Sequence, residues 1–487
     1  MKFGQHNGEF SVENTKKIMF RQIPSVDDLL VASGIRSMLS TIPRALVLRA
    51  IRQILDELRE QIRKASASDE MPDVGLSTVV DQITRRVSLL SRPSLRQVIN
   101  ATGVIVHTNL GRSPVPKRVI TAFDSLAGCY SNLEYDLNSG KRGSRYVHVQ
   151  DILRELTGAE DALVVNNNAA AVLIALDTIA KGKEVVISRG QLVEIGGSFR
   201  MPDVMRKSGA KMFEVGTTNK TTIRDYEAAI VSDTALFLKV HMSNFQIVGF
   251  TQEVSLEELV GLGKKYSIHV MEDLGSGCLI DLSRYGLKKE PTVQDSVKKG
   301  ADIITFSGDK MLGGPQCGII LGKKDIISKI KANQLSRALR VDKLTLIALQ
   351  ETLSMYRDEE KAIRQIPTLR MICQSYPSVC RKAERLRGFI GKIDTSNFVI
   401  SLSDGFSQVG GGALPLEGIE SRLLCLSPRR LSASHIVEFL RFYNPPIVAR
   451  LEKDNVLLDL RTIQEKEVKI VAAAIQKMST KKVQPVD

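Results

Sequence analysis

The chain has 487 residues, of which 43% are apolar, and this length is too great for a single hydrophobic core, so we expect two or three domains. No apolar run is long enough to cross a membrane, and the N-terminus lacks the hydrophobic region of a signal peptide. The six cysteines form no Cys-x-x-Cys pair. We therefore expect a cytoplasmic protein without a metal site or a disulfide framework. The formal net charge of +14 favours contact with a polyanion, although a protein that is merely basic remains an open alternative.

Residues 1–66 are predicted to form a basic helical domain. Residues 1–24 are polar and should be loosely ordered, Ser25 is typical of a helix start, and a longer helix opens near Pro43 and ends near Ala65. Its apolar side chains share one face, while the rest of the surface carries Arg44, Arg49, Arg52, Arg59, Arg63 and Lys64. Such a surface is most often simply solvated, but arginines can also pair with phosphates. Residues 67–99 are expected to be a linker that holds one short helix near 76–91.

Strands and helices alternate from about residue 100 to 357, which predicts a mostly parallel sheet covered by helices on both faces. The predicted strands of this α/β region lie at 163–165, 185–188, 210–215, 235–240, 269–272, 303–306 and 319–321. Residues 358–487 differ in pattern, with strands expected at 398–402, 422–425, 447–451 and 456–460 and helices near 432–443 and 464–478. We interpret this second region as a smaller α+β domain with an antiparallel sheet.

Lys310 carries the strongest chemical signal in the sequence. It follows the apolar run 301–306 and precedes a Gly-Gly-Pro turn, so its amine should stand at the end of a strand rather than on a solvated helix. A lysine in that position can be desolvated, lose its proton and form a Schiff base with an aldehyde cofactor. Most lysines are surface charges, but the turn that follows favours a cofactor lysine.

A pyridoxal phosphate cofactor would need companions for this lysine. Asn167, Asn168 and Ala169 leave a predicted strand and enter a helix, whose N-terminal N–H groups could bind the phosphate, although a polar helix cap is the simpler role for either asparagine. Asp273 ends a predicted strand and could hold the protonated ring nitrogen, whereas its neighbour Glu272 should point to the opposite face of the sheet.

Other candidates in the sequence are less well defined. Ser307 could contact the cofactor phosphate, and His241 could face the cofactor ring or be an ordinary core histidine. Arg337 and Arg340, three residues apart on an expected helix, would share a face and could bind one small oxyanion together with Arg96. An exposed basic stripe is the alternative for these arginines.

Taken together, the sequence motifs resemble those of the bacterial selenocysteine synthases, the L-seryl-tRNA(Sec) selenium transferases. The resemblance rests on the runs 100–114, 215–219, 306–318, 337–345, 409–415 and 444–450 and extends through nearly the whole chain. It implies a fold-type I pyridoxal-phosphate enzyme, with Lys310 as the catalytic and cofactor-binding lysine, that assembles into a homo-oligomer, usually a decamer. It also implies an N-terminal domain that binds tRNA.

The reaction implied by this resemblance converts L-seryl-tRNA(Sec) to L-selenocysteinyl-tRNA(Sec). The serine hydroxyl is eliminated, and selenium from selenophosphate is added in its place, with Arg96, Arg337 and Arg340 as the expected anion clamp. Two alternatives stay open: a related pyridoxal-phosphate lyase that acts on a free amino acid or amino sugar acid, and an inactive RNA-binding protein on the same fold. The basic N-terminal helix argues against the lyase, and Lys310 with Asp273 argues against the inactive protein.

Overall fold

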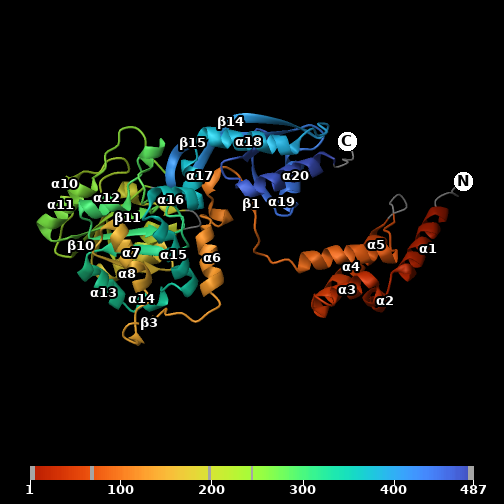
Figure 1. Ribbon diagram of the computed structural model, residues 1–487, viewed down its shortest axis with the longest axis horizontal. Coiled ribbons are helices and arrows are strands. Elements are labelled where there is room, and N and C mark those ends of the chain that lie inside the picture. Colours follow the sequence, from red (N-terminus) through yellow and green to blue (C-terminus); the bar gives the residue numbers. More distant parts are fainter. Residues whose placement is uncertain (1–5, 66–70, 196–198, 243–244, 481–487) are drawn as a thin grey trace. The chain divides into compact units, whose positions relative to one another are not determined.

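The chain divides into two compact units, residues 1–97 and residues 98–487. This computed structural model describes residues 6–65, 71–195, 199–242 and 245–480 (Figure 1), so the first residues of the expected linker at 67–99 lie outside the described residues. Within these ranges, none of the helices combines the length and the apolar character that a membrane crossing requires.

The first unit is helical, as the sequence predicts. Its helices are α1 (His6–Gln22), α2 (Val26–Val31), α3 (Ser33–Met38), α4 (Arg44–Lys64) and α5 (Leu76–Leu90). The Ser25 side chain caps α2 and accepts a hydrogen bond from Asp28 N. One expectation is corrected, because α1 occupies most of the segment expected to be loosely ordered. The helix expected near 76–91 is present as α5, and its Val79, Ile83 and Val87 share a hydrophobic core with α4, so this part of the expected linker is packed into the first unit.

The second unit contains a seven-stranded sheet in the order β5-β13-β12-β11-β10-β6-β9. Its strands are β5 (Asp161–Val165), β6 (Glu184–Ser188), β9 (Lys211–Val215), β10 (Thr234–Val240), β11 (His269–Gly275), β12 (Ile303–Ser307) and β13 (Gly318–Gly322). All neighbours are parallel except β13, which is antiparallel to both β12 and β5. The predicted mostly parallel sheet is therefore confirmed.

Helices cover both faces of this sheet (Figure 1), which explains why its strands are nearly continuous apolar runs. One face packs against α7 (Val147–Thr157), α11 (Leu256–Tyr266), α12 (Val293–Lys299) and α15 (Lys343–Met355). The other face packs against α8 (Asn168–Ile179), α9 (Met201–Lys207) and α13 (Lys324–Ala332). Side chains that alternate along β11 thus enter two different cores.

A second, six-stranded sheet has the order β1-β16-β17-β15-β14-β2. Its strands are β1 (Ile99–Ala101), β2 (Val104–Val106), β14 (Phe398–Gly410), β15 (Ala413–Pro428), β16 (Ile447–Glu452) and β17 (Asn455–Asp459), and α18 (Tyr376–Ile390), α19 (Ala433–Phe442) and α20 (Val468–Ser479) share its core. The four strands predicted after residue 397 are present. Residues 100–106 were expected to belong to the α/β region, but residues 99–106 add β1 and β2 to this second sheet, where they pair in parallel with β16 and β14.

Only Thr102 and Gly103 separate β1 from β2, although these strands stand at opposite ends of the strand order. The two ends of the sheet must therefore lie close together, and Gly103 joins them. Its N–H donates to Thr462 Oγ1 over 3.2 Å, its carbonyl accepts from Gln408 N over 2.8 Å, and its φ is +81°. A Cβ atom at this position would lie 2.2 Å from Asp459 Oδ2.

Gly103→Ala should lower the free energy of unfolding by about 3 kcal/mol or more, because it combines a left-handed backbone with a clash against a buried carboxylate. Asp459 cannot move aside easily, since it accepts hydrogen bonds from Ser407 Oγ and Ser421 Oγ over 2.7 and 2.6 Å. Gly286→Ala is the matched control, because Gly286 also has a φ of +81° but has no atom within 4 Å of the added Cβ. Urea unfolding that gave equal losses for both variants would contradict the clash.

Candidate active site

Lys310 lies in the loop between β12 and β13 and is 6% exposed. The loop is closed by hydrogen bonds from Gly308 N to Cys317 O and from Gly314 N to Gly308 O, over 2.9 and 2.8 Å. The Ser113 hydroxyl donates to the Lys310 carbonyl over 2.6 Å, and Met311 N donates to Ser276 O over 3.1 Å. The backbone that carries the amine is therefore held by segments distant in sequence, as a precisely placed reactive group requires.

Burial lowers the pKa of the Lys310 amine, because the charged form loses its hydration. Asp273 and Asp309 oppose this shift by attraction, while the Arg112 guanidinium adds to it by repulsion. The net result is an amine that releases its proton more readily than a solvated lysine. This is the property required of a lysine that condenses with an aldehyde or acts as a base.

Asp273 is fully buried on the face of β11 that packs against α8. Its Oδ1 accepts hydrogen bonds from Asn168 Nδ2 over 2.8 Å, from Thr305 Oγ1 over 3.0 Å and from Gly275 N over 3.3 Å. Burial nevertheless raises the pKa of this carboxyl group, because desolvation outweighs the three donors and the attraction of Lys310. A buried carboxyl group of this kind is suited to hold a cationic partner such as a protonated ring nitrogen.

The polar residues predicted to bind phosphate lie at the N-terminus of α8, where the chain leaves β5. Asn167 is the helix cap, and its Oδ1 accepts from Ala170 N over 2.9 Å, which is the simpler role that the sequence left open. Asn168 contacts Asp273, and its Oδ1 is buried without a hydrogen-bond partner among the described residues. Ser307 is buried at the end of β12, and Ala169 is half-buried in the first turn of α8. Their contact with a phosphate stays a prediction.

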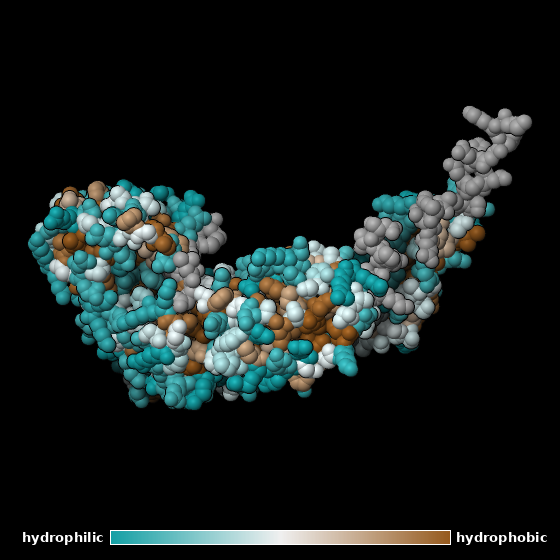
Figure 2. Space-filling model, turned by 90° about the horizontal axis from the view of Figure 1, so that it is seen from above, coloured by the Kyte–Doolittle hydropathy of each residue, from teal (hydrophilic) through white to brown (hydrophobic). Residues whose placement is uncertain are grey.

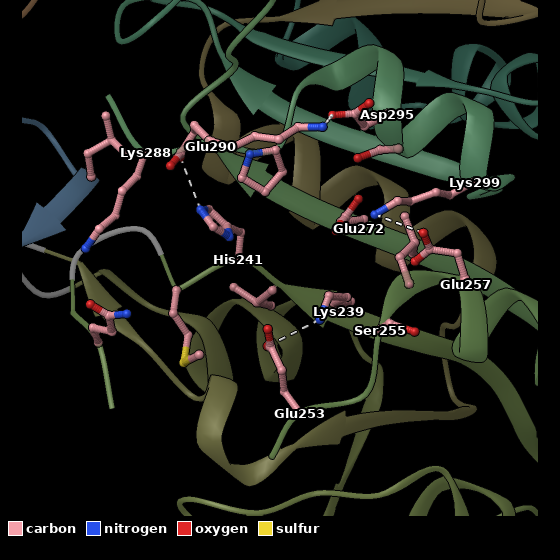
Figure 3. Close-up of a pocket in the computed structure, with 18 of the residues that line it drawn as sticks. Lys239, His241, Glu253, Ser255, Glu257, Glu272, Lys288, Glu290, Asp295 and Lys299 are labelled. Carbon is pink, nitrogen blue, oxygen red and sulfur yellow. Dashed lines mark hydrogen bonds and ion pairs between the residues drawn. The ribbon is translucent and has the colours of Figure 1, made fainter. Parts of the chain in front are cut away.

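His241 follows β10 and contacts both the Asp273 backbone and a second buried acid, Glu290. Its backbone N–H donates to the Asp273 carbonyl over 2.9 Å, and its Nε2 lies 3.1 Å from Glu290 Oε1, which also accepts from Ser276 Oγ over 3.0 Å (Figure 3). Burial by itself would lower the pKa of His241, but the Glu290 carboxylate, together with the charge of Glu272, outweighs this effect and raises it. The ring is thus held by Glu290, and its contact with a cofactor stays a prediction.

The three predicted anion-binding arginines do not form one group on a helix. The expectation that Arg337 and Arg340 share a helical face is wrong, because α14 (Leu335–Ala338) ends between them and Arg340 forms an isolated bridge with Val165. Arg340 also pairs with Glu134 over 3.4 Å, whereas Arg337 is exposed and forms no ion pair with a described residue. Arg96 is exposed and belongs to the first unit, whereas Lys310 belongs to the second.

The structure adds one ion pair that the sequence did not suggest as part of the site. Arg112 Nη1 lies 2.8 Å from Asp309 Oδ2, and this pair adjoins Lys310. Asp309 is buried, and its Oδ1 has no hydrogen-bond partner among the described residues. Arg112 ends one of the sequence motifs and Asp309 directly precedes Lys310, but no periodic pattern links residues so far apart in the chain.

The side chains present fit a pyridoxal phosphate cofactor. They combine a desolvated lysine, a buried carboxyl group, the buried amide oxygen of Asn168, which no described residue contacts by a hydrogen bond, and a helix N-terminus at the carboxyl ends of parallel strands. With its mostly parallel sheet, small C-terminal sheet and helical N-terminus, the protein has the architecture of the fold-type I pyridoxal-phosphate enzymes.

Comparison with known proteins places the chain within this class. The L-seryl-tRNA selenium transferase family matches residues 98–464, and the selenocysteine synthase N-terminal family matches residues 20–59. The chain belongs to the L-seryl-tRNA selenium transferase family.

Two curated relatives and one solved structure illustrate the similarity. The L-seryl-tRNA(Sec) selenium transferases of Geotalea daltonii and Solidesulfovibrio magneticus are 50% and 52% identical, each over 94% of this chain and over 99% and 97% of their own lengths. The structure of D-glucosaminate-6-phosphate ammonia-lyase superposes with a TM-score of 0.56 at 22% identity, over 79% of this chain and 96% of the lyase. This last likeness shows the shared fold alone.

Proposed function

We propose that this protein converts L-seryl-tRNA(Sec) to L-selenocysteinyl-tRNA(Sec), with selenium supplied by selenophosphate and with pyridoxal phosphate attached to Lys310. The observation that carries the proposal is the buried lysine beside Asp273 in a chain that matches selenium transferases over nearly its full length. Retention of the amine and the carboxyl group argues against an inactive RNA-binding protein, and the basic helical unit argues against a lyase that acts on a free amino acid.

Lys310 and Asp273 would hold the aldehyde carbon and the ring nitrogen of the cofactor. The N-terminus of α8, with Asn167, Asn168 and Ala169, and the nearby Ser307 would bind its phosphate. When bound, pyridoxal phosphate serves as the electron sink that allows a serine β-hydroxyl to leave.

The protein's own groups then have distinct roles. Lys310 Nζ removes the proton from the serine Cα and later returns it, and the lowered pKa of this amine suits both directions of transfer. Asp273 stays fixed by Asn168 and Thr305, so it need not rearrange during the reaction. Arg337, Arg340 and Arg96 are the proposed contacts for selenophosphate, and exposed Arg337 is the most accessible because Arg340 is paired with Glu134.

The first unit is the proposed tRNA-binding part. Its helix α4 buries its apolar face, including Ile51, Leu55 and Ile62, and exposes its basic residues to solvent. Arg59 and Arg63 are paired with Asp56 and Glu60 on the same helix. Arg44, Arg49 and Arg52 are exposed and form no ion pair with any described residue, so they are available for phosphate contacts.

The double variant Arg49→Ala/Arg52→Ala should weaken tRNA binding about tenfold and reduce its dependence on salt, because two phosphate contacts are lost. The turnover of the folded enzyme at saturating tRNA should stay close to that of the wild type. Filter binding at several salt concentrations measures both the affinity and the salt slope. Arg59→Ala/Arg63→Ala is the matched control on the same helix, and equal weakening by the two double variants would contradict a specific role for the unpaired arginines.

We further infer that the protein forms a homo-oligomer, with a decamer as the size expected from its family. Exposed large apolar side chains on the second unit support an interface, among them Tyr130, Leu137 and Phe250. Hydrophobic residues are visible at the surface in the space-filling view (Figure 2). Light scattering of the purified protein measures the mass, and a monomer at micromolar concentration would exclude the assembly.

The decisive experiment combines the purified protein, pyridoxal phosphate, seryl-tRNA(Sec) and selenophosphate. Selenium should appear in the aminoacyl group of the tRNA, and omission of selenophosphate should prevent this. A parallel reaction with free serine tests the lyase. Consumption of free serine without selenium transfer to tRNA would replace the proposed function by the lyase activity.

A further inference from the structure

A second cavity lies beside β11 on the face of the large sheet opposite to the Asp273 carboxyl group. Its volume is about 380 Å³, within the range of small-molecule sites. Glu272 and Lys239 point toward it because side chains alternate along β11 and β10, and residues of α11 and α12 complete its wall (Figure 3). The cavity and the Asp273 carboxyl group therefore lie on opposite faces of the same strand, β11.

Most charged side chains that line this cavity are already paired. Lys239 Nζ lies 3.4 Å from Glu253 Oε2 and donates to the Val254 carbonyl over 2.8 Å. The other pairs are Lys299 with Glu257 at 3.2 Å and His241 with Glu290 at 3.1 Å, both labelled in Figure 3, and Lys289 with Asp295 at 3.6 Å. These pairs leave little charge available for a further ligand.

Glu272 differs from the other acids of the cavity. It is 5% exposed, and its Oε2 has no hydrogen-bond partner among the described residues. Burial raises the pKa of its carboxyl group, although a hydrogen bond from Ser296 and the charges of Lys239, His241 and Lys299 act in the opposite direction. Lys288 lies well apart from Glu272 in the close-up, on the side of His241 (Figure 3). A buried carboxyl oxygen without a partner is costly, so this atom marks a position where a donor from outside would be stabilised. A cationic donor would in addition favour the ionised form of the carboxyl group against the effect of burial.

We propose that this cavity binds a small organic cation, an alkylguanidinium or alkylammonium compound, whose N–H groups donate to Glu272. A cation is favoured over a neutral donor because charge-assisted hydrogen bonds to a carboxylate are the stronger ones. The alkyl part would lie against the apolar part of the wall, which consists of Val240, Met242, Phe245, Leu256, Pro291 and Leu414. An apolar wall with one convergent polar group is the usual composition of a small-molecule site.

The test is titration of the cofactor-loaded protein with n-butylguanidinium, followed by saturation-transfer NMR and calorimetry. A guanidinium is used because a primary amine could condense with an aldehyde cofactor elsewhere in the protein. The neutral isostere n-butylurea has nearly the same shape and separates charge from size. We expect the cation to bind with a Kd of about 1 mM or tighter and the urea to bind at least about tenfold more weakly.

Two variants assign the binding to Glu272. Glu272→Gln keeps the volume of the side chain and removes its charge, and it should weaken the cation at least about tenfold. Glu253→Gln is the matched control from the same cavity, where Lys239 keeps its bond to the Val254 carbonyl, and it should change the Kd by less than about threefold.

Equal binding of the cation and the urea, no saturable binding, or unchanged affinity in Glu272→Gln would each overturn the proposal. The comparison of the two ligands needs no variant, so it decides the question even if Glu272→Gln fails to fold. Because only binding is measured, the result is independent of whether the protein transfers selenium to tRNA.

Discussion

Lys310→Ala is expected to abolish selenium transfer, with a loss of about 10⁴-fold or more, because the variant lacks both the attachment point of the cofactor and the base at the serine Cα. The folded structure should survive, since the Lys310 backbone is held by Ser113 and Ser276 rather than by the amine. The visible absorbance of the lysine-bound cofactor should disappear. Borohydride reduction followed by peptide mapping should find no modified peptide at this position.

The control for this prediction is Lys324→Ala, which removes an exposed lysine just after β13 and should leave turnover unchanged. Cofactor trapped on a lysine other than Lys310 in the wild-type protein would contradict the assignment. Unchanged absorbance in Lys310→Ala would do the same. Added methylamine should restore a small part of the activity if the amine itself is the missing group.

Asp273→Asn should reduce kcat about 10³-fold, which corresponds to about 4 kcal/mol of transition-state stabilisation. The amide can still accept hydrogen bonds from Asn168 and Thr305, so the change removes charge with little loss of geometry. Asp273 also raises the pKa of Lys310 by attraction, so its neutralisation should lower that pKa further. The pH dependence of cofactor attachment measures this second effect and should shift to lower pH.

Asp302→Asn provides a buried carboxyl control away from the proposed chemistry. Asp302 precedes β12 and accepts from Val270 N over 2.7 Å, at the end of the strands opposite to Asp273. Its loss should reduce stability while kcat per folded molecule stays near that of the wild type. If both variants lowered kcat equally, the effect of Asp273→Asn would reflect general damage to the sheet rather than a role at the cofactor.

The sequence was a good guide where a local pattern determines the structure. The large sheet was predictable because strands covered on both faces are continuous apolar runs, and Lys310 and Asp273 stand where such runs end. Glu272 was correctly expected to face away from Asp273, since alternation along a strand is a strictly local rule.

The sequence pattern failed to predict structure where a strand or side chain pairs with a residue that is distant in the sequence. Strands β1 and β2 have three residues each and pair with strands that lie more than three hundred residues later in the chain, so no local pattern could predict them. The ion pair between Arg112 and Asp309 could not be predicted from the sequence for the same reason. The spacing of Arg337 and Arg340 predicts one helix, but the chain leaves α14 after Ala338, and Arg340 forms a bridge with Val165.

The pairing of residues 99–106 with strands near the C-terminus constrains the order of folding during synthesis. The ribosome releases this segment long before β14 and β16 exist, so it must wait, unpaired and apolar, while the large sheet forms. Nascent chains that stop short of β16 would leave β1 and the edge of β15 that pairs with β17 without partners, and they should be prone to aggregation or proteolysis. The second sheet can therefore form completely only after β14 to β17 have been synthesised.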